Sequence, residues 1–172
     1  MKLNPQATNS VQQQRMLALA IQIAATAHLH QLDQGKKAYI LHPLRVMNNL
    51  TIQDPELQQI AILHDVMEDC PKWTLQKLRE AGFSERVLSA LALMTKSQED
   101  FDAGDEGYFN YIRRMFSSLD AMLVKIADLT DNSDLTRMKG LRDKDMLRTM
   151  KYMKSYAMLR DEVRRMFPHI GI

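Results

Sequence analysis

Four side chains that could do chemistry stand close together within an apolar stretch. In AILHDVMEDC, residues 61–70, they are His64, Asp65, Glu68 and Asp69. Positions i, i+1, i+4 and i+5 of a helix advance by about 0°, 100°, 40° and 140° around its axis, so all four would share less than half of the circumference. Three carboxylates this close repel one another and are costly in apolar surroundings unless positive charge lies among them. The cluster is therefore typical of a divalent cation site, although a solvated acidic helix face is the alternative.

Two further residues favour the cation over a solvated helix face. His42 precedes a proline at the start of an expected helix, where its side chain can project into a cleft, and Asp128 stands within the apolar stretch VKIADLTDN. A histidine from one helix, the pair His64 and Asp65 from a second, and an aspartate from a third give a mixed nitrogen and oxygen ligand set. Such a set suits Mn²⁺, Fe²⁺ or Zn²⁺ rather than Ca²⁺.

Helices must position these side chains. Every periodic stretch is helical, and no alternation of apolar and polar residues extends beyond four positions, which favours helices over strands. The first helix is expected to begin at Ser10, where Gln13 completes a capping box, and to be central because apolar residues lie nearly all round it. Further helices are expected from residue 42 and over residues 54–69, 74–82, 84–95, 108–117, 119–131 and 143–167. The sequence predicts an all-α fold in a single domain over residues 1–172.

Two other segments carry a structural prediction. KSQEDFDAGDEG, residues 96–107, is acidic and contains glycines, which is typical of a mobile lid. In the C-terminal helix, helical spacing relates Met146, Met150, Met153, Ala157 and Phe167. Such a stripe indicates core packing or a partner surface rather than a cofactor site.

Composition narrows the classes of function. The chain has 172 residues, of which 45% are apolar and 26% charged, and its formal net charge is +2; this is the profile of an ordinary globular domain. Lysines and arginines are spread along the chain, so we expect no nucleic-acid partner. No apolar run approaches the roughly 18 residues that span a bilayer, and the start MKLNPQATNS is too polar for a secretory signal. We therefore expect a cytoplasmic protein that does not bind membranes and acts on a small molecule; the sequence does not specify its oligomeric state.

Five ordered motifs make the sequence resemble a known family. They are AHxxQ at Ala27–Gln31, YIxHP at Tyr39–Pro43, LHDVxED at Leu63–Asp69, LxxMTK at Leu91–Lys96 and VKIADxxxN at Val124–Asn132. Over about residues 15–140, this order resembles the HD-domain hydrolases of the RelA/SpoT family, and most of all the small alarmone hydrolases that lack a synthetase domain. The resemblance implies an HD-domain helical bundle that removes the 3′-pyrophosphate of guanosine tetra- and pentaphosphate and releases pyrophosphate.

The resemblance also implies a metal site. In the family one Mn²⁺ is bound by the histidine of the HP motif, the HD pair and the aspartate of the VKxAD motif. The matching residues of this sequence are His42, His64, Asp65 and Asp128. A bound metal lowers the pKa of its water toward neutrality and neutralises charge that develops on the phosphoryl oxygens. The acidic cluster is tolerated, on this interpretation, because an ion compensates it.

Water activation and nucleotide binding follow from the same resemblance. The ED pair one turn after HD holds and activates the attacking water, and it corresponds to Glu68 and Asp69. Either carboxylate can shuttle the proton. The asparagine four residues after the last metal aspartate helps to bind the nucleotide, and it is Asn132 here.

Two departures from the family concern the base. A QxRK arginine packs on the base in the family, but counting back from His42 places Asp33 at that position and Gln34 at the lysine. An aspartate cannot stack as a guanidinium does, and it repels phosphate. In the family the aspartate of the VKxAD motif is followed by an arginine and then by HN or YN. In this sequence Leu129, Thr130 and Asp131 precede Asn132 instead. We expect hydrolysis to persist with a changed base preference, and adenosine alarmones are a second substrate class.

Several cations are candidates for phosphate contacts. Lys36 and Lys37 lie near the missing arginine and either substitute for it after a loop shift or are solvated loop charges. Lys96, Lys125 and Arg45 either contact phosphate or pair with neighbouring acids.

Two alternative functions stay open. One is an HD phosphohydrolase for another nucleotide, and the other is a regulatory module that holds metal and nucleotide without turnover.

Overall fold

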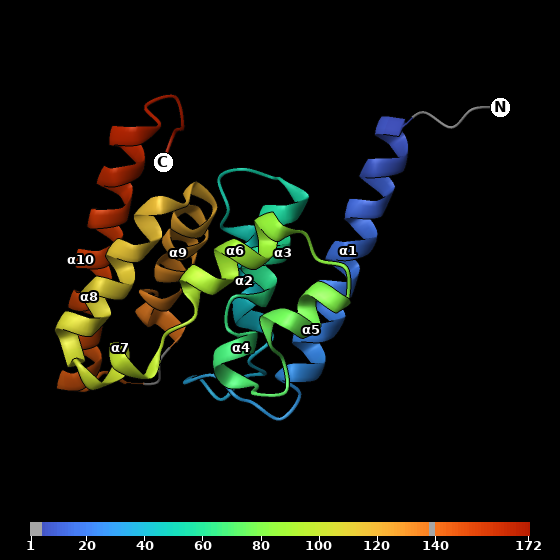
Figure 1. Ribbon diagram of the computed structural model, residues 1–172. Coiled ribbons are helices and arrows are strands. Elements are labelled where there is room, and N and C mark those ends of the chain that lie inside the picture. The colour runs from blue at the N-terminus through green and yellow to red at the C-terminus, as the bar shows by residue number, and fades with distance from the viewer. Residues whose placement is uncertain (1–4, 138–139) are drawn as a thin grey trace.

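The chain folds into helices joined by short connections (Figure 1). The computed structural model describes residues 5–137 and 140–172, and within these ranges its regular structure is helical apart from one isolated antiparallel bridge between Leu32 and Ala38. The helices are α1 (Pro5–Ala27), α2 (Leu41–Asn48), α3 (Pro55–Leu63), α4 (Val66–Asp69), α5 (Leu75–Glu80), α6 (Glu85–Met94), α7 (Gln98–Asp102), α8 (Gly104–Arg114), α9 (Leu119–Asn132) and α10 (Asp143–Met166), with 3₁₀ turns η1 (Met115–Ser117) and η2 (Leu135–Arg137). The predicted all-α fold is confirmed.

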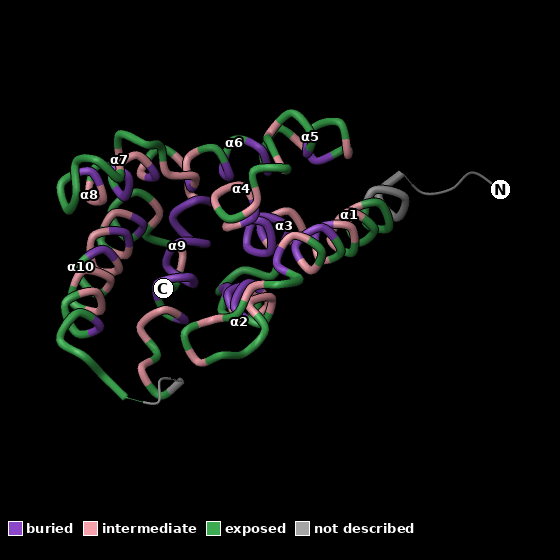
Figure 2. The backbone as a smooth tube through the Cα atoms, turned by 90° about the horizontal axis from the view of Figure 1, so that it is seen from below, coloured by how far each residue is buried: buried purple, intermediate pink, exposed green. Residues whose placement is uncertain are grey.

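Helix α9 is the centre of this arrangement. It packs against α2, α3, α6 and α10, and every residue from Ala121 to Leu129 is buried, as Figure 2 shows. The expectation that the first helix is central is wrong. Helix α1 lies at one side against α3, and within residues 10–27 it buries only Ala20, Ile23 and Ala24. Met16, Leu17, Leu19 and Ile21, on its other faces, are only partly buried.

Side-chain caps fix where several helices begin. Asp54, Thr74 and Ser84 each accept a hydrogen bond from the backbone N–H three residues further on. Each bond satisfies a donor that the first turn of a helix leaves without an intrahelical partner. These three predicted starts are confirmed. Ser10, in contrast, lies inside α1, which begins at Pro5, so its predicted role as a cap is wrong.

The helix predicted over residues 54–69 is divided in two by a turn. Helix α3 ends before His64, α4 begins after Asp65, and these two residues form the turn. His64 Nδ1 donates to the carbonyl oxygen of Ala61 at 2.8 Å, and this carbonyl is the one that the N–H of residue 65 would use in a continuous helix. The turn brings His64 and Asp65 to α9 and leaves the two following acids on the separate short helix α4.

The segment of residues 96–107 forms parts of two helices. Ser97 and Asp100 make a capping box that starts α7, and Gly104, the first residue of α8, takes a φ of +61°, a conformation that glycine adopts at no steric cost. The prediction of a loop-like lid is therefore wrong. The acidic residues that suggested a solvated loop serve instead as first-turn residues of α7 and α8, where they interact favourably with the helix dipole.

Helix α10 turns a different face to the core from the one its methionines suggest. Leu159 and Val163 are fully buried, whereas Met146, Met150 and Met153 are exposed. The two sets have the same helical spacing but lie on different faces, so the periodicity alone could not separate them. The core alternative for the methionine stripe is wrong, and the partner surface stays a prediction.

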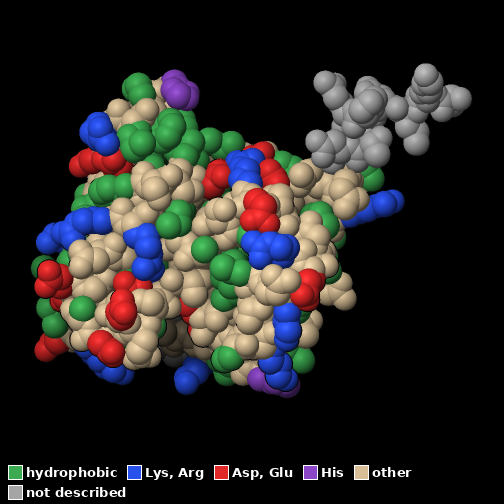
Figure 3. Space-filling model, in the orientation of Figure 1, with side chains coloured by type: hydrophobic (Ala, Val, Ile, Leu, Met, Phe, Trp, Pro, Cys, Tyr) green, Lys and Arg blue, Asp and Glu red, His purple; other side chains and the backbone are tan. Residues whose placement is uncertain are grey.

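The surface carries charges of both signs. On the face drawn in Figure 3, acidic and basic side chains are interspersed rather than gathered into a field of one sign. Within residues 5–137 and 140–172, no helix combines the length and the apolar character that crossing a bilayer requires.

Close packing between α7 and α8 gives a test of the fold. A Cβ at Gly107 would lie 2.3 Å from the carbonyl oxygen of Asp100 and 2.9 Å from Cβ of Ala103, so Gly107→Ala must force the two helices apart. We expect a free energy of unfolding lower by about 1–3 kcal/mol, the usual range for overpacking. Gly171→Ala is the control, since a Cβ there meets nothing within 4 Å. Equal denaturation midpoints for the two variants would contradict the packing described for α7 and α8.

Candidate active site

Three parts of the chain meet at the predicted metal ligands. His42 lies in the first turn of α2, His64 and Asp65 form the turn after α3, and Asp128 lies in the central helix α9. His42 Nε2 is 3.4 Å from Asp65 Oδ2 and 3.1 Å from Asp128 Oδ1. His64 Nε2 is 3.1 Å and 3.5 Å from the same two oxygens. The structure thus brings all four side chains together.

Each histidine is oriented through its other ring nitrogen. His42 Nδ1 donates to Asp131 Oδ2 at 2.7 Å, and His64 Nδ1 donates to the carbonyl oxygen of Ala61 at 2.8 Å. Because a carboxylate and a carbonyl can only accept, Nδ1 carries the hydrogen in both rings and Nε2 faces the cluster. A histidine that donates through one nitrogen and presents the other is the usual arrangement of a metal ligand.

The geometry of the cluster fits one divalent ion. Bonds of about 2.0–2.2 Å from a metal to nitrogen and oxygen place neighbouring ligand atoms about 3.0–3.5 Å apart, and the four distances above lie in that range. His64 Nε2 is buried and has no hydrogen-bond partner among the described atoms, although buried polar atoms normally have one. His42, His64 and Asp65 place their ligand atoms within 4.8 Å of one another. This group could hold a metal.

The pKa values of the two histidines reflect the acids around them. Burial lowers the pKa of His42, but hydrogen bonds to Asp128 and Asp131 help to raise it to about 11. Burial also lowers the pKa of His64, but the negative charges of Asp65 and Asp128 beside the ring raise it to about 9. Both rings therefore hold a second proton readily where a cation would otherwise lie.

The carboxylates of the cluster are held ionised. Burial would raise the pKa of Asp128, but Lys125 and the two histidines hold it well below its usual range. Lys125 Nζ donates to Asp128 Oδ2 at 2.7 Å, and the side chain of Asn132 donates to Asp128 Oδ1. Tyr39 donates its hydroxyl to Asp65 Oδ2 at 2.6 Å. Burial and the charge of Asp65 raise the pKa of Tyr39 far above its usual value, so the phenol remains a donor.

Two acids on α4 stand beside the cluster, each held by a separate donor. Lys96 donates to Glu68 from its backbone N–H at 2.7 Å and from Nζ at 3.0 Å. Gln31 Nε2 donates to Asp69 Oδ2 at 2.8 Å, and His28 Nδ1 donates to Gln31 Oε1 at 2.7 Å. His28 is thus a buried, hydrogen-bonded histidine that also orients the amide holding Asp69. Burial raises the pKa of Asp69, which makes its carboxylate a better proton acceptor.

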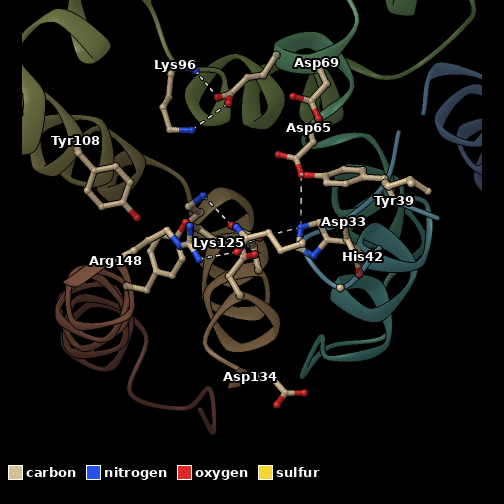
Figure 4. A pocket seen from close by; sticks show the side chains of 17 residues that line it. Asp33, Tyr39, His42, Asp65, Asp69, Lys96, Tyr108, Lys125, Asp134 and Arg148 are labelled. Atoms are coloured by element: carbon tan, nitrogen blue, oxygen red, sulfur yellow. Dashed lines mark hydrogen bonds and ion pairs between the residues drawn. The ribbon is translucent and has the colours of Figure 1, made fainter. Parts of the chain in front are cut away.

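A pocket of about 310 Å³ (Figure 4) is lined by His42, Asp65 and Asp128 of the cluster and by Glu68 and Asp69 of α4, whereas His64 does not line it. Its size lies at the lower end of the range for small-molecule sites, about 300–1,000 Å³. Tyr108 of α8 and Arg148 of α10 lie across the pocket from Tyr39 and His42 in Figure 4. Arg148 donates to Gln34 Oε1 at 2.7 Å, which joins α10 to the loop after α1. The pocket therefore has one acidic, histidine-bearing wall and one wall with an arginine and aromatic rings.

Sequence reasoning missed the second wall. Arg148 and Tyr152 both line the pocket, and since they are four residues apart they share one face of α10. The four-residue spacing of Arg148 and Tyr152 can be read from the sequence. The exposed methionine stripe has the same helical period, however, so the spacing does not show which of the two faces of α10 is turned inward. Only the packing of α10 on α9 shows which face meets the pocket.

The loop lysines lie apart from the cluster. Lys36 and Lys37 are exposed and neither lines the pocket; Lys36 lines an adjacent hollow instead. Asp33, at the position of the family arginine, does line the pocket. Its side chain accepts the backbone N–H of Lys37 at 2.9 Å. Arg148 lines the same pocket from α10, and the substitution of the missing arginine by either loop lysine stays a prediction.

Comparison with known proteins gives a consistent set of relatives. The chain is 31% identical over 117 residues to guanosine-3′,5′-bis(diphosphate) 3′-pyrophosphohydrolase of Vibrio cholerae, covering 64% of the chain and 16% of that protein. It is 32% identical over 120 residues to the protein of the same name from Haemophilus influenzae, covering 64% and 17%. It is 30% identical over 123 residues to the bifunctional (p)ppGpp synthase/hydrolase SpoT of Escherichia coli K12, covering 69% and 18%.

These matches cover only a small part of each relative. The chain spans less than a fifth of the length of the curated relatives it matches. No family model matches the chain. The relatives support a likeness to the SpoT and RelA type of pyrophosphohydrolase over about two thirds of the chain, which is the family that the five motifs indicated.

The histidine pKa values predict how stability depends on pH. A histidine whose pKa is raised in the folded state contributes stability that is full below its unfolded value near 6.5 and is lost as the pH rises through the folded value. His42 and His64 have folded values of about 11 and about 9. We expect the melting temperature of the protein in a chelator to fall as the pH rises from about 6.5 toward 9.

Added Mn²⁺ should stabilise the protein more strongly across the same pH interval, because protons and metal compete for the same ring nitrogens. Calorimetric melting curves with and without metal provide the measurement. His64→Asn should flatten the fall in chelator, whereas His30→Asn, an exposed histidine, should not. A melting temperature in chelator that rises over this interval would contradict the assignment of the cluster.

Proposed function

We propose that the chain is a metal-dependent hydrolase of the RelA/SpoT type. It removes the 3′-pyrophosphate of guanosine tetra- and pentaphosphate and releases pyrophosphate, with the adenosine analogues as a second substrate class. The observation that carries the proposal is that the Nε2 atoms of His42 and His64 each lie 3.1–3.5 Å from one carboxylate oxygen of Asp65 and one of Asp128, beside a pocket that three of these four residues line. The substrate is proposed from the relatives, which are named as guanosine-3′,5′-bis(diphosphate) 3′-pyrophosphohydrolases.

One divalent ion would be held by His42, His64, Asp65 and Asp128. We propose Mn²⁺, and Fe²⁺ or Zn²⁺ would suit the same mixture of imidazole and carboxylate ligands. When bound, such an ion supplies positive charge for the phosphoryl oxygens and lowers the pKa of a water molecule toward neutrality. The hydrogen bonds to each Nδ1 support this assignment because they leave Nε2 of each ring directed into the cluster.

Glu68 and Asp69 are proposed to position the attacking water and take its proton. Asp69 suits the role of proton acceptor, since burial raises its pKa and a general base works best when its pKa lies nearer the working pH. Glu68 is fixed by two bonds from Lys96. With both side chains held by neighbours, little reorganisation is needed before the proton moves.

Positive side chains around the pocket suit a polyphosphate. Lys96 and Lys125 line the pocket near the acids that they neutralise, and Arg148 lines it from α10. In phosphoryl transfer the main task of the protein is to stabilise spread negative charge and to position the groups. We propose that these three cations contact phosphate oxygens and that Asn132 contributes a hydrogen bond to the nucleotide.

A specific observation favours a second candidate, an HD phosphohydrolase that acts on another nucleotide. Asp33 faces the pocket at the position where the family has its base-packing arginine, and a carboxylate neither stacks on a base nor attracts phosphate. A binding module without turnover is the third alternative, but the presence of Glu68 and Asp69 opposes it. The HD-domain class, the single domain over residues 1–172, the cytoplasmic location and the small-molecule partner stay predictions.

Product identity tests the proposal. Purified protein with Mn²⁺ should release pyrophosphate from guanosine tetraphosphate, and parallel reactions with adenosine alarmones should report the base preference. Orthophosphate released from mononucleotides alone would support the second candidate. Tight binding of guanosine tetraphosphate without any product would leave only the binding module.

Single substitutions separate the two carboxylates from the metal ligands. Glu68→Gln and Asp69→Asn should each lower kcat by about 10²–10⁴-fold, the usual contribution of a general acid or base. Their Mn²⁺ affinity should change little, because neither residue is among the four ligands. Glu85→Gln, which removes an exposed carboxylate paired with Arg79, is the matched control and should keep full turnover. Intact turnover in the double variant of Glu68 and Asp69 would show that other groups activate the water.

A further inference from the structure

A second carboxylate of α9 lies behind the candidate metal site. Asp131 is buried, and its Oδ2 accepts the Nδ1 hydrogen of His42 at 2.7 Å. Arg45 holds the same carboxylate from Nε, 2.6 Å from Oδ1, and from Nη2, 3.2 Å from Oδ2. His42 and Arg45 lie three residues apart on α2, so one face of α2 supplies both partners.

The imidazole of His42 is clamped between two acids of one helix. Asp128 and Asp131 are three residues apart and lie on one face of α9. Asp128 Oδ1 stands 3.1 Å from Nε2 of the ring, while Asp131 accepts from Nδ1. Both ring nitrogens are therefore placed by α9, and the angle of the ring cannot change without breaking one of these contacts.

The charge of Asp131, as well as its position, affects the imidazole of His42. A carboxylate that accepts the Nδ1 hydrogen makes the opposite nitrogen a stronger donor to a metal than a neutral acceptor does. The side chain of Asp131 is only 4% exposed, and a carboxylate buried to this extent stays charged only with a positive partner. Arg45, whose side chain is 32% exposed, is one such partner, and its two parallel bonds also fix the plane of the carboxylate.

We propose that Asp131, held by Arg45, is a positioning residue for the metal site. It fixes His42 in the tautomer with hydrogen on Nδ1 and raises the donor strength of Nε2, and so it sets the affinity for a transition-metal ion. This inference rests on the proposed function only in assuming that His42 is a ligand. It concerns a residue pair that neither the motif analysis nor the relatives' names assign, and Arg45 serves the metal site rather than phosphate.

Metal affinity measured directly tests the inference. Calorimetric titration of the full chain with Mn²⁺ should give a Kd about 10–100-fold weaker for Asp131→Ala than for the wild type, the usual effect of losing a group that orients a ligand. Asp120→Asn is the matched control. Asp120 lies on the same helix and makes the same two-bond contact with an arginine, Arg86, but away from the pocket, so its Kd should stay within about twofold.

A double variant separates position from charge. Arg45→Met with Asp131→Asn keeps a carbonyl oxygen that can accept from His42 but removes both charges. We expect it to keep the Nδ1–H tautomer, read from the ¹⁵N shifts of the His42 ring, and to bind Mn²⁺ with an affinity between those of Asp131→Ala and the wild type. It also supplies a folded test if the alanine variant is too unstable to purify.

The outcomes distinguish this inference from the proposed function. Wild-type affinity and an unchanged His42 tautomer in Asp131→Ala, or in the double variant if only that can be purified, would overturn the inference even if alarmone hydrolysis is intact. A wild-type protein that binds Mn²⁺ through an Asp131-dependent site but hydrolyses no alarmone would support the inference and overturn the proposed function. No Mn²⁺ binding by the wild type would overturn both.

Discussion

A carboxylate buried in a helical core must be compensated by positive charge or hydrogen bonds. Asp128 is such a carboxylate, and it lies on α9, the helix against which α2, α3, α6 and α10 pack. Lys125 and Asn132, on α9 itself, donate to Asp128. Two imidazoles approach the same carboxylate from α2 and from the turn after α3. Loss of one partner from a buried ionic group typically costs about 3–5 kcal/mol, so the relative positions of α2, α3 and α9 depend on this one charge.

His42 and His64 can take part in compensating the buried carboxylates in two protonation states without moving. With a hydrogen on both ring nitrogens they donate to the carboxylates, and the raised pKa values of His42 and His64 describe this state. As neutral rings they offer Nε2 to a metal ion, which takes the place of the protons. In either state Nδ1 donates to Asp131 or to the carbonyl of Ala61, so the same scaffold holds the rings. The site is thereby preorganised for metal.

Sequence patterns predicted the features that depend only on residues close together in the chain. The helix starts at Asp54, Thr74 and Ser84 could be predicted because a cap needs only a side-chain oxygen and the next turn of helix. The turn at His64 could not be predicted, since it depends on whether its ring takes the Ala61 carbonyl. The methionine stripe of α10 was ambiguous because two faces of that helix share one period. Of the site, the four candidate ligands could be predicted from sequence patterns, whereas the contact of Asp131 with α2 depends on tertiary packing.

The two walls of the pocket depend on different parts of the fold. The histidine and carboxylate wall is fixed by α2, α4, α9 and the turn after α3, all of which belong to one packed core. The facing wall depends on α10 and on the loop after α1, which Arg148 joins through Gln34. An arginine on a helix packed against α9 is positioned by the core, while one in the loop would be positioned mainly by local turns. With Asp33 in the loop and Arg148 on α10, the residues of the facing wall can differ from those of relatives while the geometry of the histidine and carboxylate wall stays the same.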